Sequence, residues 1–232
     1  MTMTESAGFP DLSLVTSARV SEALSALLTE ARLASRWAGL SHVSQSAHRR
    51  ILRAFLSHGR PPDIAAFSGD VLEDLAKRDL VHVRDGRIAL AYPFSTGATD
   101  FEVSVEGIGL HAVCAIDALG VAAMAGRRAE VSCRCPVCQV PATVAIAADG
   151  LTIKDASSRS ARVWTGVMDV GSCAADSQCK TMRLFCSPDH LATWRKENGA
   201  TRGFDLTLEE GIHLGAAIFR PFLNDDARRP RV

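Results

Sequence analysis

Apolar residues recur at three- and four-residue steps through the first third of the chain. This spacing is typical of amphipathic helices with one buried face. It predicts helices over residues 16–40, 46–57, 63–68 and 71–79, with the G-R-P-P sequence (59–62) ending the second. The buried side of that second helix is expected to contain Ile51, Leu52, Phe55 and Leu56.

Residues 80–94 alternate between apolar and polar positions on both sides of Asp85-Gly86, which predicts a β-hairpin. Helix, short helix, helix and hairpin together are typical of a winged helix, a unit that often binds DNA. Lys77 and Arg78 are the basic residues of its second full helix, and three acidic residues lie beside them. We therefore expect a structural or lid role here rather than nucleic acid binding.

The second half of the chain mixes strand and helix patterns. Strands are predicted over 101–105, 128–133, 142–147, 162–170 and 180–187, and helices over 109–126, 188–199 and 206–219. Ser187 is the expected N-cap of the helix that starts at Pro188. The predicted fold class is α+β: a winged-helix-like helical domain, then a mixed or antiparallel sheet domain with flanking helices. The predicted divisions are a flexible N-terminus (1–15), the two domains (16–96 and 97–224) and a frayed tail (225–232).

Charge and composition are those of an ordinary globular protein. The 26 basic residues equal the 26 acidic residues in number, so net charge favours neither nucleic acid nor an anionic membrane. No secretory signal pattern is found, and the apolar run 109–126 is interpreted as a core helix rather than a bilayer span because it contains His111 and Asp117. We therefore expect a cytoplasmic protein. In a reducing compartment, its seven cysteines indicate metal binding or catalysis more than disulfides.

Cys114 and Asp117 are the first candidates for chemistry. On a helix that starts near Leu110 they share a face, and the helix N-terminus would favour a thiolate at Cys114. The alternative is a small core cysteine beside an aspartate that caps the helix or pairs with an arginine. His111, one turn earlier, is interpreted as a core or helix-start residue. Cys179 is expected to be exposed at a strand edge.

Two stretches of the sequence resemble a known protein family. The sequence F-E-V-S-V-E-G-I-G-L-H-A-V-C-A-I-D-A-L, with the following G-R-R-A-E-V-S-C-R-C-P-V-C-Q-V-P-A-T-V, resembles the organomercurial (alkylmercury) lyase family. The later run C-K-T-M-R-L-F-C-S-P-D-H-L-A-T-W resembles it as well. The resemblance covers residues 45–220, including the winged-helix-like part.

The resemblance implies a carbon–mercury lyase that acts in mercury detoxification and resistance and needs no cofactor. The family's two cysteines fall on Cys114 and Cys179, and its aspartate falls on Asp117. Mercury is a soft metal that binds thiolates, and a carboxylic acid can protonate the leaving carbon. The implied products are a hydrocarbon and Hg(II) held by Cys114 and Cys179. A small organomercurial is the implied substrate, and a cellular thiol or a mercuric reductase is the implied acceptor of Hg(II).

The chain also departs from the family pattern. Val113 replaces the tryptophan found before the first catalytic cysteine in well-known members, and Lys180 replaces a second cysteine. Val113 leaves the substrate open, so one alternative is a lyase-like fold that performs cysteine-dependent chemistry on an organic, biosynthetic substrate. Another alternative is a non-enzymatic, thiol-based metal-responsive regulator.

A cluster of three cysteines forms a further candidate site. Cys133, Cys135 and Cys138 supply three of the four ligands of a structural zinc site, and Cys173 or Cys186 could supply the fourth. A mercury-collecting relay and plain buried or surface thiols are the alternatives. His190 and Trp194 are interpreted as packing residues of their helix.

Overall fold

The first half of the chain is mostly helical. The structure, a computed structural model, describes residues 9–31, 33–168 and 173–223. The first elements are η1 (Leu12–Leu14), α1 (Ala18–Thr29), α2 (Leu33–Trp37), α3 (His42–His58), η2 (Ile64–Ala66), α4 (Gly69–Lys77), β1 (Val81–Arg84) and β2 (Arg87–Ala91). The predicted hairpin is confirmed, with positive φ at Asp85 and Gly86 as a tight two-residue turn requires. The four apolar residues expected on the buried side of α3 are all buried.

The prediction of one helix over 16–40 is wrong, because α1 and α2 are separate helices. The apolar side of α1 packs against the C-terminal helix α7 (Leu208–Leu223). In α2, Trp37 contacts different partners, stacking on Phe9 and lying 4.5 Å from the ring of Phe222. Tertiary packing of these two faces therefore overrides the continuous periodicity of the sequence.

The second half supplies most of the strands. Its elements are β3 (Phe94–Ser95), β4 (Phe101–Val105), β5 (Ile108–Ala112), α5 (Ala115–Ala125), β6 (Ala129–Arg134), β7 (Pro141–Ile146), β8 (Ile153–Ala156), β9 (Arg162–Gly166), η3 (Ala174–Asp176), η4 (Gln178–Thr181), β10 (Met182–Phe185), α6 (Pro188–Glu197), β11 (Gly203–Thr207) and α7. Sequence periodicity did not predict β8 and β11. The expected frayed tail (225–232) lies outside the described residues.

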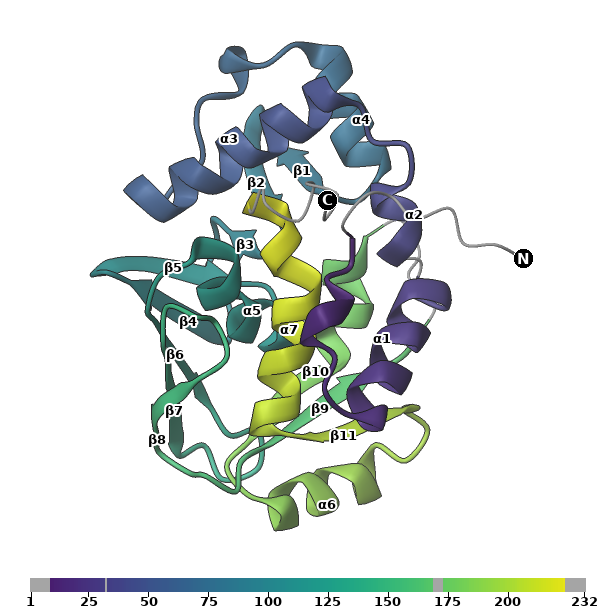
Figure 1. The fold of residues 1–232 in the computed structure, drawn as a ribbon, viewed down its shortest axis with the longest axis vertical. Coiled ribbons are helices and arrows are strands. Elements are labelled where there is room, and N and C mark those ends of the chain that lie inside the picture. The colour runs from purple at the N-terminus through teal and green to yellow at the C-terminus, as the bar shows by residue number, and fades with distance from the viewer. Residues whose placement is uncertain (1–8, 32, 169–172, 224–232) are drawn as a thin grey trace.

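The strands form two antiparallel sheets around a helical centre (Figure 1). One sheet has eight strands in the order β1-β2-β3-β5-β4-β6-β7-β8, and the other has three in the order β10-β9-β11. Helix α5 contacts β4, β5 and β6 of the larger sheet and β10 of the smaller one, and it packs closely on α7. Gly120 and Gly215 allow this approach, since a Cβ on Gly120 would lie 2.7 Å from the Gly215 carbonyl oxygen.

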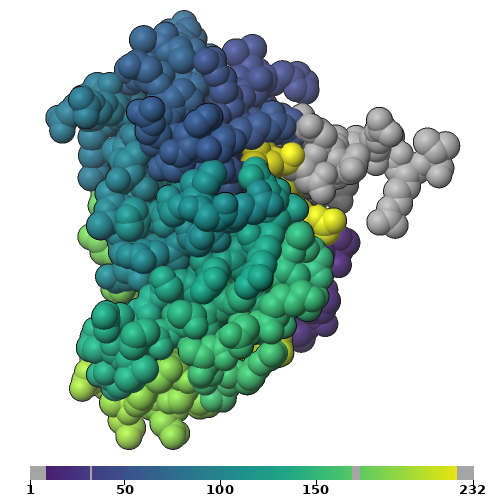
Figure 2. Space-filling view, turned by 90° about the vertical axis from the view of Figure 1, so that its left-hand side faces the viewer, coloured from purple at the N-terminus to yellow at the C-terminus, as the bar shows by residue number. Residues whose placement is uncertain are grey.

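The two halves share the larger sheet. Strand β3 pairs with β2 on one side and with β5 on the other, so hydrogen bonding is continuous across the division predicted at residues 96 and 97. Figure 2 shows residues of the first half, in blue, lying directly against residues of the second half, in teal and green. Residues 9–15 also belong to the folded core, because Leu14 is buried and the Asp11 amide donates to the Ala217 carbonyl. None of the helices in the described residues combines the length and the apolar character that crossing a bilayer requires.

Candidate active site

Cys114 begins helix α5 rather than lying within it. The expected helix over 109–126 is wrong in its first part, because residues 108–112 pair as strand β5 with both β4 and β3. Cys114 has extended backbone angles and is the N-cap of α5, and its sulfur accepts a hydrogen bond from the Asp117 amide at 3.5 Å. The thiol therefore takes the place that a serine hydroxyl usually has at a helix start, with Asp117 in the first turn. His111 lies on β5, so the expectation that it precedes Cys114 by one helical turn is also wrong.

Cys179 is buried, contrary to the expectation that it is exposed at a strand edge. It lies in the short helix η4, and its exposed fraction is 8%. The neighbouring Gln178 fixes this helix to the end of β9: its side-chain oxygen accepts from the Met168 amide at 2.9 Å, and its nitrogen donates to the Gly166 carbonyl. Two side-chain hydrogen bonds of Gln178 therefore hold the segment that carries Cys179 against the end of β9.

The structure brings Cys179 next to Cys114 and Asp117, although Cys179 lies far from both of them in the sequence. The two sulfur atoms and a carboxylate oxygen of Asp117 all lie within 4.8 Å of one another, and all three residues are buried. A hydrogen bond joins the two thiols, and the Met182 sulfur lies 3.3 Å from the sulfur of Cys114. Asp117 Oδ2 has no hydrogen-bond partner among the described residues.

Burial favours the neutral, protonated form of all three groups and so raises their pKa values. It raises the pKa of Asp117 from 3.8 to about 7, although hydrogen bonds from Cys114 and the charge of Arg36 act in the opposite direction. Burial also raises the pKa of Cys114 well above its ordinary value, so the helix N-terminus does not produce the resting thiolate expected from the sequence. The hydrogen bond with Cys114 would lower the pKa of Cys179, but burial and the Asp117 carboxylate together raise it.

A small cavity opens onto Asp117 and Cys179. Its volume is about 50 Å³, and its wall includes Arg36, Tyr92 and Phe222. A larger hollow of about 640 Å³ lies elsewhere on the surface, beside residues such as Cys133 and Arg183, and it touches none of the three clustered groups. The small cavity is therefore the one that gives access to Asp117 and Cys179 of this group.

A polar network next to this cavity holds the segment that carries Cys179. Arg36 forms an ion pair with Asp79 at 2.8 Å, and Asp79 accepts a hydrogen bond from the Ala174 amide at 3.0 Å. Tyr92 accepts one from the Ala175 amide at 2.7 Å. No local sequence pattern marks Arg36, Asp79 or Tyr92, because the three residues lie far apart along the chain and meet only in the folded protein.

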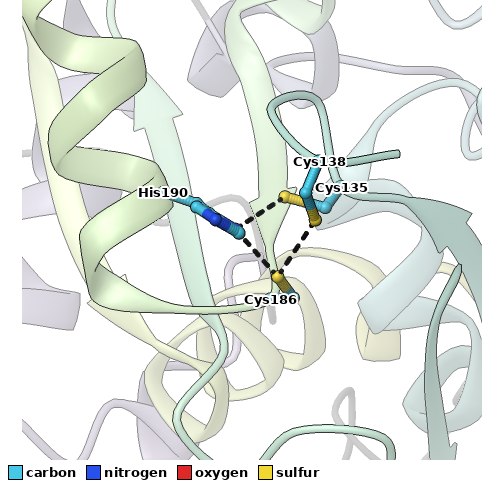
Figure 3. A group of neighbouring side chains, drawn as sticks. All are labelled: Cys135, Cys138, Cys186 and His190. Atoms are coloured by element: carbon cyan, nitrogen blue, oxygen red, sulfur yellow. Dashed lines mark hydrogen bonds between the residues drawn. The ribbon is translucent and has the colours of Figure 1, made fainter. Parts of the chain in front are cut away.

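The cysteine cluster has a different membership from the one expected. Cys135 and Cys138 are joined by Cys186 and His190, and their ligand atoms lie within 4.8 Å of one another (Figure 3). Cys133 is not part of this group. It lies within strand β6 and is buried, and burial raises its pKa to about 12.

The other residues considered from the sequence have separate surroundings. Cys173 lies with Asp79 and His82 rather than with the cysteine cluster. Trp194 packs against Trp164 and Phe185, which confirms its interpretation as a packing residue. His190, interpreted in the same way, instead directs its Nδ1 atom toward two sulfur atoms.

Comparisons with known proteins agree with this arrangement. Two buried thiols beside a protonatable carboxyl define a thiol-based site for a soft metal, and the family model described as "MerB: Alkylmercury lyase" matches residues 94–220. The chain belongs to the alkylmercury lyase family and is therefore a carbon–mercury lyase. A solved structure entitled "Crystal structure of the mercury-bound form of MerB2" has a similar fold, with a TM-score of 0.69 and 22% sequence identity over 90% of this chain and 100% of that chain. The curated proteins include no match to this chain.

Proposed function

We propose that Cys114, Cys179 and Asp117 together cleave the carbon–mercury bond of a small organomercurial. The observation that carries this proposal is the close grouping of two buried thiols and one buried carboxyl, all within 4.8 Å. Mercury is soft and prefers thiolate ligands over nitrogen or oxygen. Two thiols at this separation can bind one mercury atom between them, with the carboxyl next to the carbon that leaves.

The reaction balances with these groups alone. Cys114 displaces the ligand X from R–Hg–X, and its thiol proton leaves with X as HX. Asp117, protonated when the substrate binds, donates its proton to the carbon as the carbon–mercury bond breaks, which releases R–H. Cys179 binds the same mercury as a thiolate, and its thiol proton passes to the Asp117 carboxylate, which leaves Hg(II) bound to two thiolates. The reaction requires no cofactor.

The position of Asp117 suits proton donation. A general acid works best when its pKa is near the operating pH, and burial raises the pKa of Asp117 to about 7. Asp117 Oδ2 is buried and has no hydrogen-bond partner within the described ranges, so its proton is free to transfer to the substrate. A carboxyl with an ordinary pKa would be almost fully ionised at neutral pH and would hold no proton to give.

The size of the cavity favours a small organic group. A cavity of about 50 Å³ holds only a few water molecules, since one water needs roughly 10–15 Å³, so it suits a small group such as methyl on mercury. An aryl group would require the surrounding side chains to move, among them Phe222. Val113 is half-buried against the core and is not among the residues that line this cavity. We therefore propose that short alkylmercury compounds are the preferred substrates.

Several broader features follow from this function. Hg(II) would leave by exchange to a cellular thiol or a mercuric reductase, and a cytoplasmic location fits the seven cysteines, all of which are free. The division into domains 16–96 and 97–224 remains a proposal, supported by the family match beginning at residue 94. A winged-helix-like character of the first part is supported by the order α3, η2, α4 and the β1–β2 hairpin. A structural zinc ion, one of the possibilities for the cysteine cluster, would take no part in the reaction steps.

Release of methane from methylmercury in the presence of excess thiol tests the proposal. Cys114→Ser, Cys179→Ser and Asp117→Asn should each reduce turnover by at least about 100-fold, a typical contribution of a catalytic acid or base. Cys133→Ser is the matched control, because Cys133 is also buried and free but lies outside the site. Full activity in Cys114→Ser, or no methane from the wild-type protein, would refute the assignment.

A further inference from the structure

The four side chains of the second cluster have the chemistry of a closed metal site. Cys135, Cys138, Cys186 and His190 offer three sulfur atoms and one imidazole nitrogen, and all four atoms point toward one another (Figure 3). We propose that these residues bind one zinc ion as a tetrahedral Cys₃His site. Such a set is typical of structural zinc, since all four positions of the metal are filled by protein.

The distances between the ligand atoms match a tetrahedron around zinc. With Zn–S near 2.3 Å and Zn–N near 2.0–2.1 Å, two sulfur atoms should be about 3.8 Å apart and a sulfur and a nitrogen about 3.6 Å apart. The Cys138 and Cys186 sulfur atoms are 3.6 Å apart, and the Cys135 sulfur is 3.6 Å from His190 Nδ1. The Cys186 sulfur and His190 Nδ1 are closer, at 3.0 Å. A small outward shift would accommodate the ion.

The first pair of ligands comes from a tight loop that aims both sulfur atoms inward. Cys135 follows β6 directly, and its carbonyl accepts a hydrogen bond from the Gln139 amide at 2.9 Å, while Gln139 has a φ of 59°. The backbone amides of Val137 and Cys138 donate to the Cys135 sulfur. Amide groups that point at a cysteine sulfur stabilise it as a metal-bound thiolate and fix its direction.

The second pair comes from the junction of β10 and α6. Cys186 follows the last residue of β10, and His190 lies in the first turn of α6, which gives the spacing Cys-x₃-His. Ser187 caps α6 by accepting a hydrogen bond from the His190 amide at 3.2 Å, which fixes the turn between the two ligands. Together the two pairs form the arrangement Cys-x₂-Cys and Cys-x₃-His, whose spacings agree with those of structural zinc sites.

Helix α6 buries little of its surface, and the proposed zinc would add to the packing of Trp194 on Trp164 and Phe185. Leu191 is the only buried residue among the ten of α6. It belongs to a small apolar cluster with Cys135, Trp164 and Phe185 that is separate from the main core. The zinc would join the β6–β7 loop of the eight-stranded sheet to β10 and α6 at the smaller sheet.

The site also lies at the far end of a strand that leads to the lyase site. Strand β10 runs from Met182, whose sulfur contacts Cys114, to Phe185, directly before Cys186. Cys179 precedes the same strand. A zinc ion at Cys186 would therefore fix the strand that carries one wall of the active site. The zinc site itself does not depend on the proposed catalytic roles.

The metal content of the purified protein tests this inference. Protein produced with added zinc and without mercury should contain one equivalent of zinc by elemental analysis. Cys138→Ser and His190→Ala should lose it after dialysis, whereas Cys133→Ser, the neighbouring cysteine outside the cluster, should retain it. Wild-type protein without zinc, or equal loss from Cys133→Ser, would overturn the proposal.

Two further measurements remain informative if a variant fails to fold. Wild-type protein reconstituted with Co(II) should bind one equivalent and show the visible absorption of a tetrahedral thiolate complex. His190→Cys should still bind one Co(II), with a spectrum shifted toward that of four sulfur ligands. An octahedral cobalt spectrum would overturn the assignment.

Discussion

Replacing Asp117 by asparagine should stabilise the protein relative to the wild type increasingly as the pH rises from 5 to 8. Burial raises the pKa of this carboxyl from 3.8 to about 7 in the folded state. The folded protein therefore binds the proton more tightly than the unfolded chain does. Between pH 3.8 and about 7, the unfolded state releases this proton first, so the wild type loses stability as the pH rises. Asparagine does not titrate and avoids this loss.

The magnitude follows from the shifted pKa. One pKa unit corresponds to 1.36 kcal/mol, so the whole shift amounts to about 4 kcal/mol, reached above pH 7. About two pH units separate pH 5 from the pKa of Asp117 in the folded protein, so about two-thirds of this effect appears above pH 5. The free energy of unfolding of Asp117→Asn, measured relative to the wild type, should therefore increase by roughly 3 kcal/mol from pH 5 to pH 8. The Cys114 and Cys179 thiols stay protonated in the folded state over this range, because their pKa values are raised.

Urea unfolding of the two proteins at pH 5, 6, 7 and 8, with a phosphine reductant present, measures this difference. Asp149→Asn provides the control: Asp149 is exposed, and hydrogen bonds from Thr152 and Leu151 lower its pKa to about 2. It is ionised in both states above pH 5, so its substitution should change stability by the same amount at every pH tested. A difference between Asp117→Asn and the wild type that stays constant from pH 5 to 8 would refute the reasoning.

Three other predictions concern packing, positioning and turnover. Gly120→Ala should lower the free energy of unfolding by about 1–3 kcal/mol, because the added Cβ would lie 2.5 Å from Phe219 Cδ2. Gly69→Ala is the control: its Cβ would have no atom within 4 Å, so its stability should stay within about 1 kcal/mol of the wild type, and equal urea midpoints for the two variants would contradict this. Asp79→Ala removes the carboxylate that accepts the hydrogen bond from the Ala174 amide, so kcat/KM for methylmercury should fall about 10- to 100-fold while the zinc content stays unchanged. An unaltered kcat/KM would show that Asp79 does not position the segment that carries Cys179. At a fixed thiolate concentration, kcat/KM should decrease above about pH 7 as Asp117 loses its proton, and a flat profile from pH 6 to 9 would argue against Asp117 as the acid.

Local sequence signals predicted the elements that local interactions determine. The Asp85-Gly86 turn and the Ser187-Pro188 helix start were found because the required backbone conformations favour those residues. The break between α1 and α2 was not predicted, because it depends on the contacts of Trp37 with Phe222 far along the chain. Strand β11 was missed for a similar reason, since its pairing with β9 bridges residues about 40 positions apart.

The candidate site was predicted in its residues but not in its surroundings. The family resemblance indicated Cys114, Asp117 and Cys179, and the structure places their reactive atoms together. The burial of Cys179 depends on the contacts of Gln178 with the end of β9, which no local pattern reveals. The place of His190 in the second cluster was not predicted, because its contact with the cysteine pair Cys135 and Cys138 forms only in the folded chain.

The anomalous scattering of mercury in crystals of protein that has turned over one equivalent of methylmercury tests the central claim most directly. One mercury atom should lie between the sulfur atoms of Cys114 and Cys179, beside the Asp117 carboxyl, with methane released in equal amount. Crystals of Cys179→Ser treated in the same way should lack this bridged mercury. Methane release accompanied by mercury bound elsewhere, for example at Cys135, Cys138 and Cys186, with none between Cys114 and Cys179, would contradict the account.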